Sequence, residues 1–173
     1  MTATDKNGSF ATDSSHSGAS DPRVTLLPQG NHLLSLMTIL RDSNTDVANF
    51  AEVTERVGDQ LISAGVYLDV VTSETDTRFT SVRGHESSVL ILEPMLATGG
   101  SACVAIDTIK ANGVAEENIV FVNILASQRG IRILLDRFPS IRLVTAAIDN
   151  ELTPSNHISP GLGDFGDRFY GTH

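Results

Sequence analysis

The chain has 173 residues, one cysteine and a formal net charge of −9, a length that suits a single domain with a real hydrophobic core. Its acidity argues against a broad electrostatic grip on nucleic acid, and one cysteine excludes an internal disulfide and fits a reducing cytoplasm. No apolar run approaches the roughly 20 residues of a membrane span, and the first 22 residues lack the apolar core of a signal peptide, so we expect a soluble cytoplasmic protein.

The first third of the chain predicts a tail followed by two helices. Residues 1–22 are mostly Ser, Thr, Asp, Gly and Ala, which predicts a disordered tail ahead of one domain over 23–173. Order is expected to begin near Val24. A short helix ending near Arg41 and Asp42 should place four apolar side chains on one face: Leu33, Leu34, Met37 and Leu40.

A second helix is expected to start at a cap residue, Asn44 or Thr45, and to stop at Gly65. Its apolar positions keep helical spacing; they are Val47, Phe50, Val53, Val57, Leu61 and Ile62. Residues 66–72 and 78–82 then predict two short strands that form a hairpin.

From Ser88 onward strands and helices alternate. Apolar strands over 88–93, 118–124 and 141–147 are separated by helices over 101–111 and 128–137. This order predicts an α/β fold with right-handed crossovers and a parallel sheet flanked by helices. Three clear parallel strands make the sheet short, since such sheets usually have about five. Residues 150–173 are expected to be loop-like.

The end of the strand at 88–93 is the strongest candidate for a binding site. An apolar run, Val89 to Leu92, predicts a strand buried on both faces, and it delivers Glu93 into a small-residue loop. Thr98, Gly99, Gly100 and Ser101 then stand where the next helix starts. Free N–H groups and the positive end of a helix bind phosphate, and glycines let the backbone come close. The pattern predicts a phosphorylated sugar or nucleotide as ligand. Cys103, two residues into the helix, is expected to be a small buried hydrophobe rather than a nucleophile.

A second glycine-rich segment lies in the tail. Gly161-Leu-Gly-Asp-Phe-Gly166 spells the G-x-G-x-x-G pattern of dinucleotide-binding proteins. A dinucleotide-binding site is not supported here, because no predicted strand ends just before this pattern and only seven residues follow it. The histidines share no ligand spacing, so no zinc site is supported.

Two long motifs in the correct order identify a family resemblance. Glu93-Pro-Met-Leu-Ala-Thr-Gly-Gly-Ser-Ala102 closely resembles the phosphoribosyl-pyrophosphate motif of uracil phosphoribosyltransferases. Pro160-Gly-Leu-Gly-Asp-Phe-Gly-Asp-Arg-Phe-Tyr-Gly-Thr172 resembles that family's uracil-binding C-terminus. Segments 116–123, 137–145 and 38–42 also match in order. The resemblance implies a phosphoribosyltransferase-like sheet with a C-terminal base-binding tail.

The resemblance implies which residues bind the sugar phosphate. Backbone N–H groups of Ala97 to Ser101 would hold the 5′-phosphate, and Glu93 would lie near the ribose hydroxyls and, through water, Mg²⁺. Glu93 replaces the family's usual Asp, which moves the carboxylate by about one bond length. The implied phosphoribosyl-pyrophosphate set is Glu93, Pro94, Met95, Leu96, Ala97, Thr98, Gly99, Gly100, Ser101 and Asp164.

The tail residues would bind the base. Backbone groups of an irregular loop can match the carbonyl, N–H, carbonyl edge of uracil, and the resemblance gives this role to Ile158, Gly163 and Phe165, with Asp164 close to base and sugar. Asp164 is the predicted catalytic residue, acting electrostatically. Read without the family, Asp164 is a turn aspartate satisfying its own loop, and Phe165 a packing anchor for the tail. Asp167 and Arg168 are expected to pair locally and so to hold the loop.

The resemblance also reveals a gap. Family members carry some sixty or more residues between the predicted hairpin and the strand at 88, including two arginines near the pyrophosphate, and here residues 84–88 bridge the two regions directly. We therefore expect a domain internally shortened near 84–88. The implied function is uracil phosphoribosyltransferase, with Mg²⁺ bound mainly through the pyrophosphate, GTP as an effector and a homo-oligomeric state. The alternative is a catalytically impaired homologue that binds nucleotide and has a regulatory role.

Overall fold

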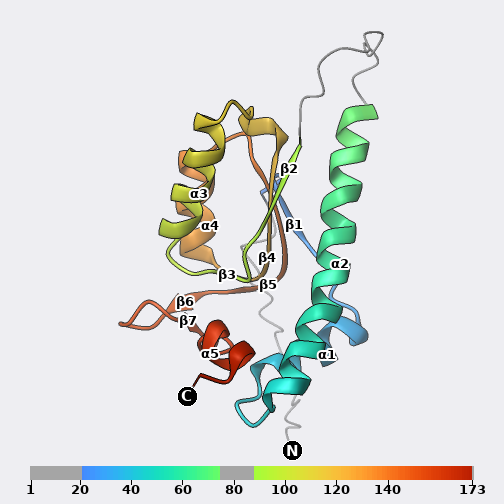
Figure 1. Ribbon diagram of the computed structural model, residues 1–173, viewed down its shortest axis with the longest axis vertical. Coiled ribbons are helices and arrows are strands. Elements are labelled where there is room, and N and C mark those ends of the chain that lie inside the picture. Colours follow the sequence, from blue (N-terminus) through green and yellow to red (C-terminus); the bar gives the residue numbers. More distant parts are fainter. Residues whose placement is uncertain (1–20, 75–87, 173) are drawn as a thin grey trace, which may run out of the picture.

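The computed structural model describes residues 21–74 and 88–172 (Figure 1). The tail predicted over 1–22 and the strand predicted over 78–82 fall almost wholly outside these residues. So does the segment 84–87, where the shortening is expected.

A five-stranded parallel sheet forms the centre of the molecule. Its strands are β1 (Val24–Leu26), β2 (Val89–Leu92), β3 (Met95–Leu96), β4 (Ile119–Ser127) and β5 (Arg142–Asp149). The order is β1-β5-β4-β2, and β3 pairs with β4 beyond the end of β2. The α/β architecture is as predicted, but the expectation of a sheet with three clear strands is wrong. β1 and β3 are three and two residues long, too short to leave a periodic signal in the sequence.

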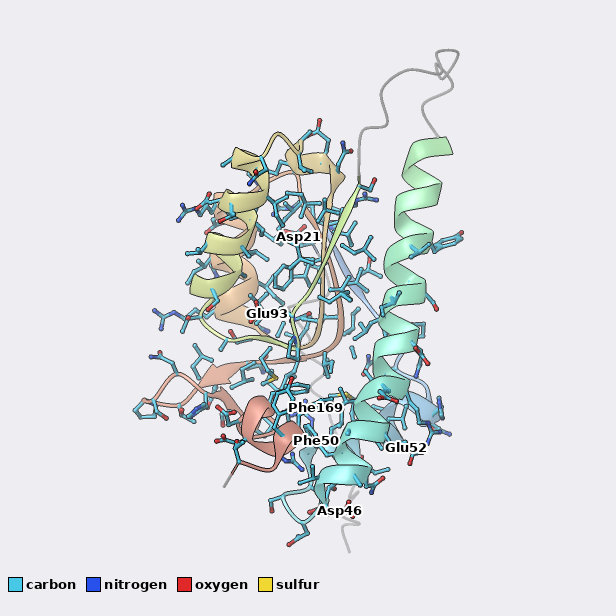
Figure 2. The ribbon with its side chains drawn as sticks, in the orientation of Figure 1. Asp21, Asp46, Phe50, Glu52, Glu93 and Phe169 are labelled. Atoms are coloured by element: carbon cyan, nitrogen blue, oxygen red, sulfur yellow. The ribbon has the colours of Figure 1, made fainter. Side chains whose placement is uncertain are left out.

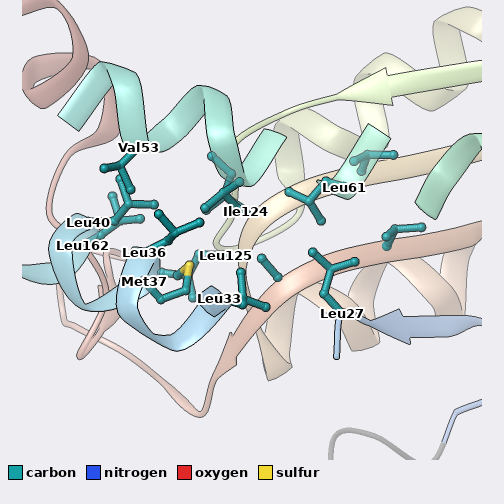
Figure 3. Packing of buried hydrophobic residues seen from close by; sticks show 14 of the residues in the cluster. Leu27, Leu33, Leu36, Met37, Leu40, Val53, Leu61, Ile124, Leu125 and Leu162 are labelled. Carbon is teal, nitrogen blue, oxygen red and sulfur yellow. The ribbon is translucent and has the colours of Figure 1, made fainter. Parts of the chain in front are cut away.

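Helices cover both faces of the sheet (Figure 1). α1 (Asn31–Arg41) and α2 (Val47–Glu74) lie on one face, and α3 (Gly100–Ala111) and α4 (Gln128–Arg137) lie on the other. A short 3-10 turn, η1 (Glu116–Asn118), leads into β4. Successive residues of β4 point to opposite faces, so Val120 and Val122 pack in the cluster under α1 and α2, whereas Phe121 packs in the cluster under α3 and α4. Figure 3 shows the first cluster, in which Leu40 lies near Val53 and Leu162, and Leu33 lies near Leu125.

The two N-terminal helices differ from the prediction at several positions. Leu36, not Leu34, completes the buried face of α1, and Leu34 is 47% exposed. The carboxylate of Asp46, not Asn44 or Thr45, caps α2 by accepting a hydrogen bond from the N–H of Asn49 at 2.9 Å.

α2 does not stop at Gly65, and residues 66–72 are helical rather than a strand. A Cβ placed on Gly65 would lie 3.2 Å from Val122 Cγ2 and 3.3 Å from a methyl of Leu90. The glycine therefore lets the helix pass close over β2 and β4, and its role is packing rather than termination.

β2 is only half-buried, and Leu92 is 59% exposed. The prediction of a strand buried on both faces is wrong here, because among the described residues β2 pairs only with β4 and forms an edge of the sheet.

The tail contains regular structure that was predicted as loop. β6 (Glu151–Leu152) and β7 (Ile158–Ser159) form a small antiparallel hairpin, and α5 (Phe165–Tyr170) follows it. α5 packs against α2, as Figure 1 shows near the C-terminus. This contact brings the predicted base-binding tail back to the C-terminal end of the sheet.

Candidate functional site

The loop after β2 is anchored to β4 by main-chain hydrogen bonds. Glu93 N–H donates to the carbonyl of Val122 at 3.0 Å, and the carbonyl of Pro94 accepts from the N–H groups of both Ile124 and Leu125 at 3.1 Å. β3 then continues alongside β4. The first half of the predicted phosphoribosyl-pyrophosphate motif is therefore part of the sheet rather than a free loop.

Ser127 holds the second half of the motif. Its hydroxyl donates to the carbonyl of Ala97 at 2.5 Å and accepts from the N–H of Gly130 at 2.8 Å, so one buried side chain both anchors the loop and caps α4. A Cβ on Gly130 would lie 2.6 Å from the Ala97 carbonyl oxygen and 2.8 Å from that of Leu96. Only glycine permits this approach of α4 to the loop. Neither Ser127 nor Gly130 carried a predicted role.

The loop ends where α3 begins. Gly99 adopts a left-handed conformation, with φ of 80°, and precedes the first turn of α3 without a side-chain cap. Thr98 is half-buried, whereas Gly100 and Ser101 are exposed. The predicted junction of a strand end and a helix start is thus present, with first-turn N–H groups that no side chain of the N-cap residue covers. Cys103 is buried, as predicted, and burial raises the pKa of its thiol.

Glu93 stands where β2 gives way to the loop (Figure 2). It is half-buried, and desolvation raises the pKa of its carboxyl above the ordinary value of 4.5. Beside it in the sheet, Asn123 is 1% exposed, and both polar atoms of its side chain are buried without a hydrogen-bond partner among the described residues.

The predicted base-binding tail is held by an ion pair that the sequence did not indicate. Both oxygens of Asp149, at the end of β5, accept from the guanidinium of Arg41 at 2.7 and 2.8 Å. Asp149 also accepts from the N–H of Gly161 at 2.8 Å, and Arg41 donates to the Gly161 carbonyl at 2.8 Å. The two side chains are 108 residues apart in sequence, so no local spacing links them.

Asp164 and Phe165 take the roles expected of them without the family. Asp164 is exposed and caps α5 by accepting from the N–H of Asp167 at 2.9 Å. The ring of Phe165 packs 5.6 Å from Phe50 and 5.5 Å from Phe169.

Arg168 holds the loop from within. Its guanidinium donates to the carbonyls of Leu40, Leu162 and Asp42 and lies 4.3 Å from the centroid of the Phe50 ring. Desolvation lowers the pKa of Arg168. Arg168 therefore holds the loop as predicted, but through main-chain carbonyls rather than through the predicted pair with Asp167, and its contacts extend to the turn after α1.

Two cavities collect most of the predicted tail residues. The first, of about 490 Å³, is lined by Glu93 and Pro94 on one side and Phe165 on the other, so it joins the start of the motif to the tail. The second, of about 520 Å³, is lined by Gly163 and Asp164. Ile158 is buried in the core, and Thr98 to Ser101 lie at the far end of the loop, beside α4.

Within the described ranges, no group of three or more His, Cys, Asp or Glu side chains is arranged to hold a metal ion. The same ranges contain no helix with the length and hydropathy needed to cross a bilayer.

Comparison with known proteins gives consistent matches. The family model for uracil phosphoribosyltransferase matches residues 60–172. Uracil phosphoribosyltransferase 2 of Schizosaccharomyces pombe is 32% identical over 209 positions, which take in 86% of this chain and 95% of that protein. The Saccharomyces cerevisiae enzyme is 31% identical over 206 positions, covering 85% and 95%. The AQ2163 protein of Aquifex aeolicus shares the fold, with a TM-score of 0.66 at 17% identity, over 85% of this chain and 97% of that one.

The alignment with the S. pombe protein also measures a difference in length. It has 209 positions, and 86% of 173 residues is about 149, so about 60 positions of the relative have no counterpart here. The matches nevertheless extend over nearly the whole of these relatives and include both motifs. The chain therefore belongs to the uracil phosphoribosyltransferase family.

Proposed function

We propose that this chain transfers the ribosyl phosphate of phosphoribosyl pyrophosphate to uracil, giving uridine monophosphate and pyrophosphate. The observation that carries the proposal is the loop from Glu93 to Ser101, which leaves the sheet beside β4 and enters α3 at a left-handed, uncapped glycine. Family membership over almost the full length of its relatives supports the same function.

The sugar phosphate would bind along this loop. Backbone N–H groups of Ala97 to Ser101 would hold the 5′-phosphate at the positive end of α3, and Ser127 and Gly130 keep the loop in place. Glu93 would bind ribose hydroxyls and stabilise positive charge that develops at the anomeric carbon. Its half-buried position strengthens that electrostatic effect.

The base would bind to the tail. Main-chain groups of Ile158, Gly163 and Phe165 would match the edge of uracil, and the Asp149–Arg41 pair holds Gly161 between them. Asp164 would act electrostatically near the sugar and base. The shared cavity, lined by Glu93 and Phe165, supports binding of the two substrates side by side.

Substitutions of Asp164 test the proposal against its structural role. Asn is as good a helix cap as Asp, so Asp164→Asn keeps the cap of α5 and removes the charge, whereas Asp164→Ala removes both. We expect Asp164→Asn to lower kcat by about 100-fold with Tm unchanged. The assay is conversion of labelled uracil with phosphoribosyl pyrophosphate and Mg²⁺. Equal kcat values for the wild type and Asp164→Asn would assign Asp164 to the cap alone.

The same assay separates the enzyme from a homologue that only binds nucleotide. Product formation supports the transferase. Stabilisation by phosphoribosyl pyrophosphate without any product would support the impaired homologue, which the full-length matches do not favour.

Several family properties complete the proposal. We propose one domain over 23–173, internally shortened near 84–88, and the roughly 60 unmatched alignment positions support a shortening of this size. Mg²⁺ would bind mainly through pyrophosphate oxygens, with Glu93 nearby through water. Cytoplasmic location, GTP as an effector and self-association stay predictions of the family resemblance.

A further inference from the structure

The buried side-chain amide of Asn123 lacks a hydrogen-bond partner within the part of the chain that the structure describes. It lies in the middle of β4 and is 1% exposed, and neither its nitrogen nor its oxygen has a hydrogen-bond partner among the described residues. Native proteins leave few buried polar side chains unpaired, because each lost hydrogen bond to water costs free energy. An unpaired amide beside a binding loop therefore calls for a ligand as its partner.

Asn123 lines a cavity. The cavity of about 490 Å³ that joins the start of the motif to the tail is lined by Asn123 of β4 and Thr54 of α2. A ligand in this cavity can therefore reach the amide.

Glu93 lines the same cavity. Leu92 pairs with Val122, and the bond from Glu93 N–H to the Val122 carbonyl extends the ladder by one residue. Glu93 and Asn123 are thus neighbours on adjacent strands, about 4.8 Å apart at the backbone.

The carboxylate and the amide have complementary chemistry. A carboxylate only accepts hydrogen bonds, whereas an amide both donates and accepts, as a hydroxyl does. Two such groups on adjacent strands suit two neighbouring hydroxyls of one ring. The loop that begins at Glu93 leads to the start of α3, where the phosphate would bind.

We propose that Asn123 binds a ring hydroxyl of the pentose while Glu93 binds the adjacent one, so that the pair selects ribose over 2-deoxyribose. The inference rests on the proposed function, because it takes the loop at 93–101 as the sugar-phosphate site. It adds a specificity-determining residue that neither motif contains.

Calorimetric titration of the full chain with ribose 5-phosphate and with 2-deoxyribose 5-phosphate tests the inference. The wild type should prefer the ribose compound. Asn123→Leu should weaken ribose 5-phosphate binding about 10-fold, which is one hydrogen bond, and leave the deoxy compound nearly unchanged. Its Tm should not fall, because two unpaired buried atoms are removed. Asn123→Ala repeats the measurement in a smaller side chain, in case leucine is too large for the site.

Thr145→Val is the matched control. Thr145 pairs with Asn123 across the sheet and is buried, but its hydroxyl already donates to the Ala147 carbonyl at 2.9 Å. The control should lose some stability and keep the preference for ribose. A preference that survives in Asn123→Ala, or that is missing from the wild type, overturns the inference.

The outcomes also separate this inference from the proposed function. If the wild type forms uridine monophosphate and the Asn123 variants still prefer ribose 5-phosphate, the proposed function stands and the inference about Asn123 is wrong. If the wild type binds neither sugar phosphate and forms no product, both the proposed function and the inference are wrong.

Discussion

Replacing Gly130 by alanine tests how α4 supports the loop from Glu93 to Ser101, the proposed phosphate site. The new Cβ would lie 2.6 Å from the Ala97 carbonyl oxygen and 2.8 Å from that of Leu96, where an ordinary contact is at least 3.4 Å. The loop or the helix must therefore move by about 0.8 Å, the difference between 3.4 and 2.6 Å. Both contacts are with backbone, so no side-chain rotation can relieve them.

The displacement should affect binding more than folding. Overpacking of this kind costs about 2 kcal/mol, which lowers Tm by roughly 4–8 °C in a chain of this size. A shift approaching 1 Å in a positioning loop can lower activity by about 100-fold. We expect kcat/KM for phosphoribosyl pyrophosphate to fall by about that factor, measured by formation of labelled uridine monophosphate.

Gly58→Ala is the matched control for this substitution. Gly58 lies inside α2, and a Cβ there meets nothing within 4 Å, so alanine should stabilise the helix by about 0.5–1 kcal/mol. Full activity in Gly130→Ala, at unchanged Tm, would refute the view that the approach of α4 holds the loop in place.

Three further substitutions probe the same region. Ser127→Ala removes the cap of α4 and the bond to Ala97, and should cost about 1–2 kcal/mol in urea unfolding and raise KM for phosphoribosyl pyrophosphate; an unchanged KM would count against the anchor. Asp149→Ala leaves Arg41 without its carboxylate partner, so it should lower the free energy of unfolding by about 3 kcal/mol and weaken uracil binding. Normal uracil affinity in a calorimetric titration would exclude a role for Asp149 in holding the tail. Glu93→Gln should be more stable than the wild type at pH 7.5, because burial raises the carboxyl pKa and its ionisation in the folded state is unfavourable. That penalty is absent below the unfolded pKa near 4.5 and complete above the folded pKa, so the stability difference should shrink as pH falls; a constant difference would show that desolvation of Glu93 is not its cause.

The sequence alone determined the α/β class, the helices predicted over 101–111 and 128–137, and the two motifs of the family. These features are local: a buried strand in a parallel sheet is a continuous apolar run, and a helix repeats its apolar positions every three to four residues. The motif residues also lie at strand ends and helix starts, where chain order alone sets the junction. For the same reason the very short β1 and β3 escaped detection, since two or three residues carry no period.

Tertiary structure decided everything that depends on residues distant in the chain. Gly65 looked like a helix stop, but the nearness of Val122 and Leu90 makes it a packing glycine inside a longer helix. The Arg41–Asp149 pair, 108 residues apart, and the unpaired amide of Asn123 have no signature in sequence spacing. Whether a polar group is paired, or a glycine is needed, depends on which atoms the folded chain brings within a few ångströms of it, and only the packed structure specifies those neighbours.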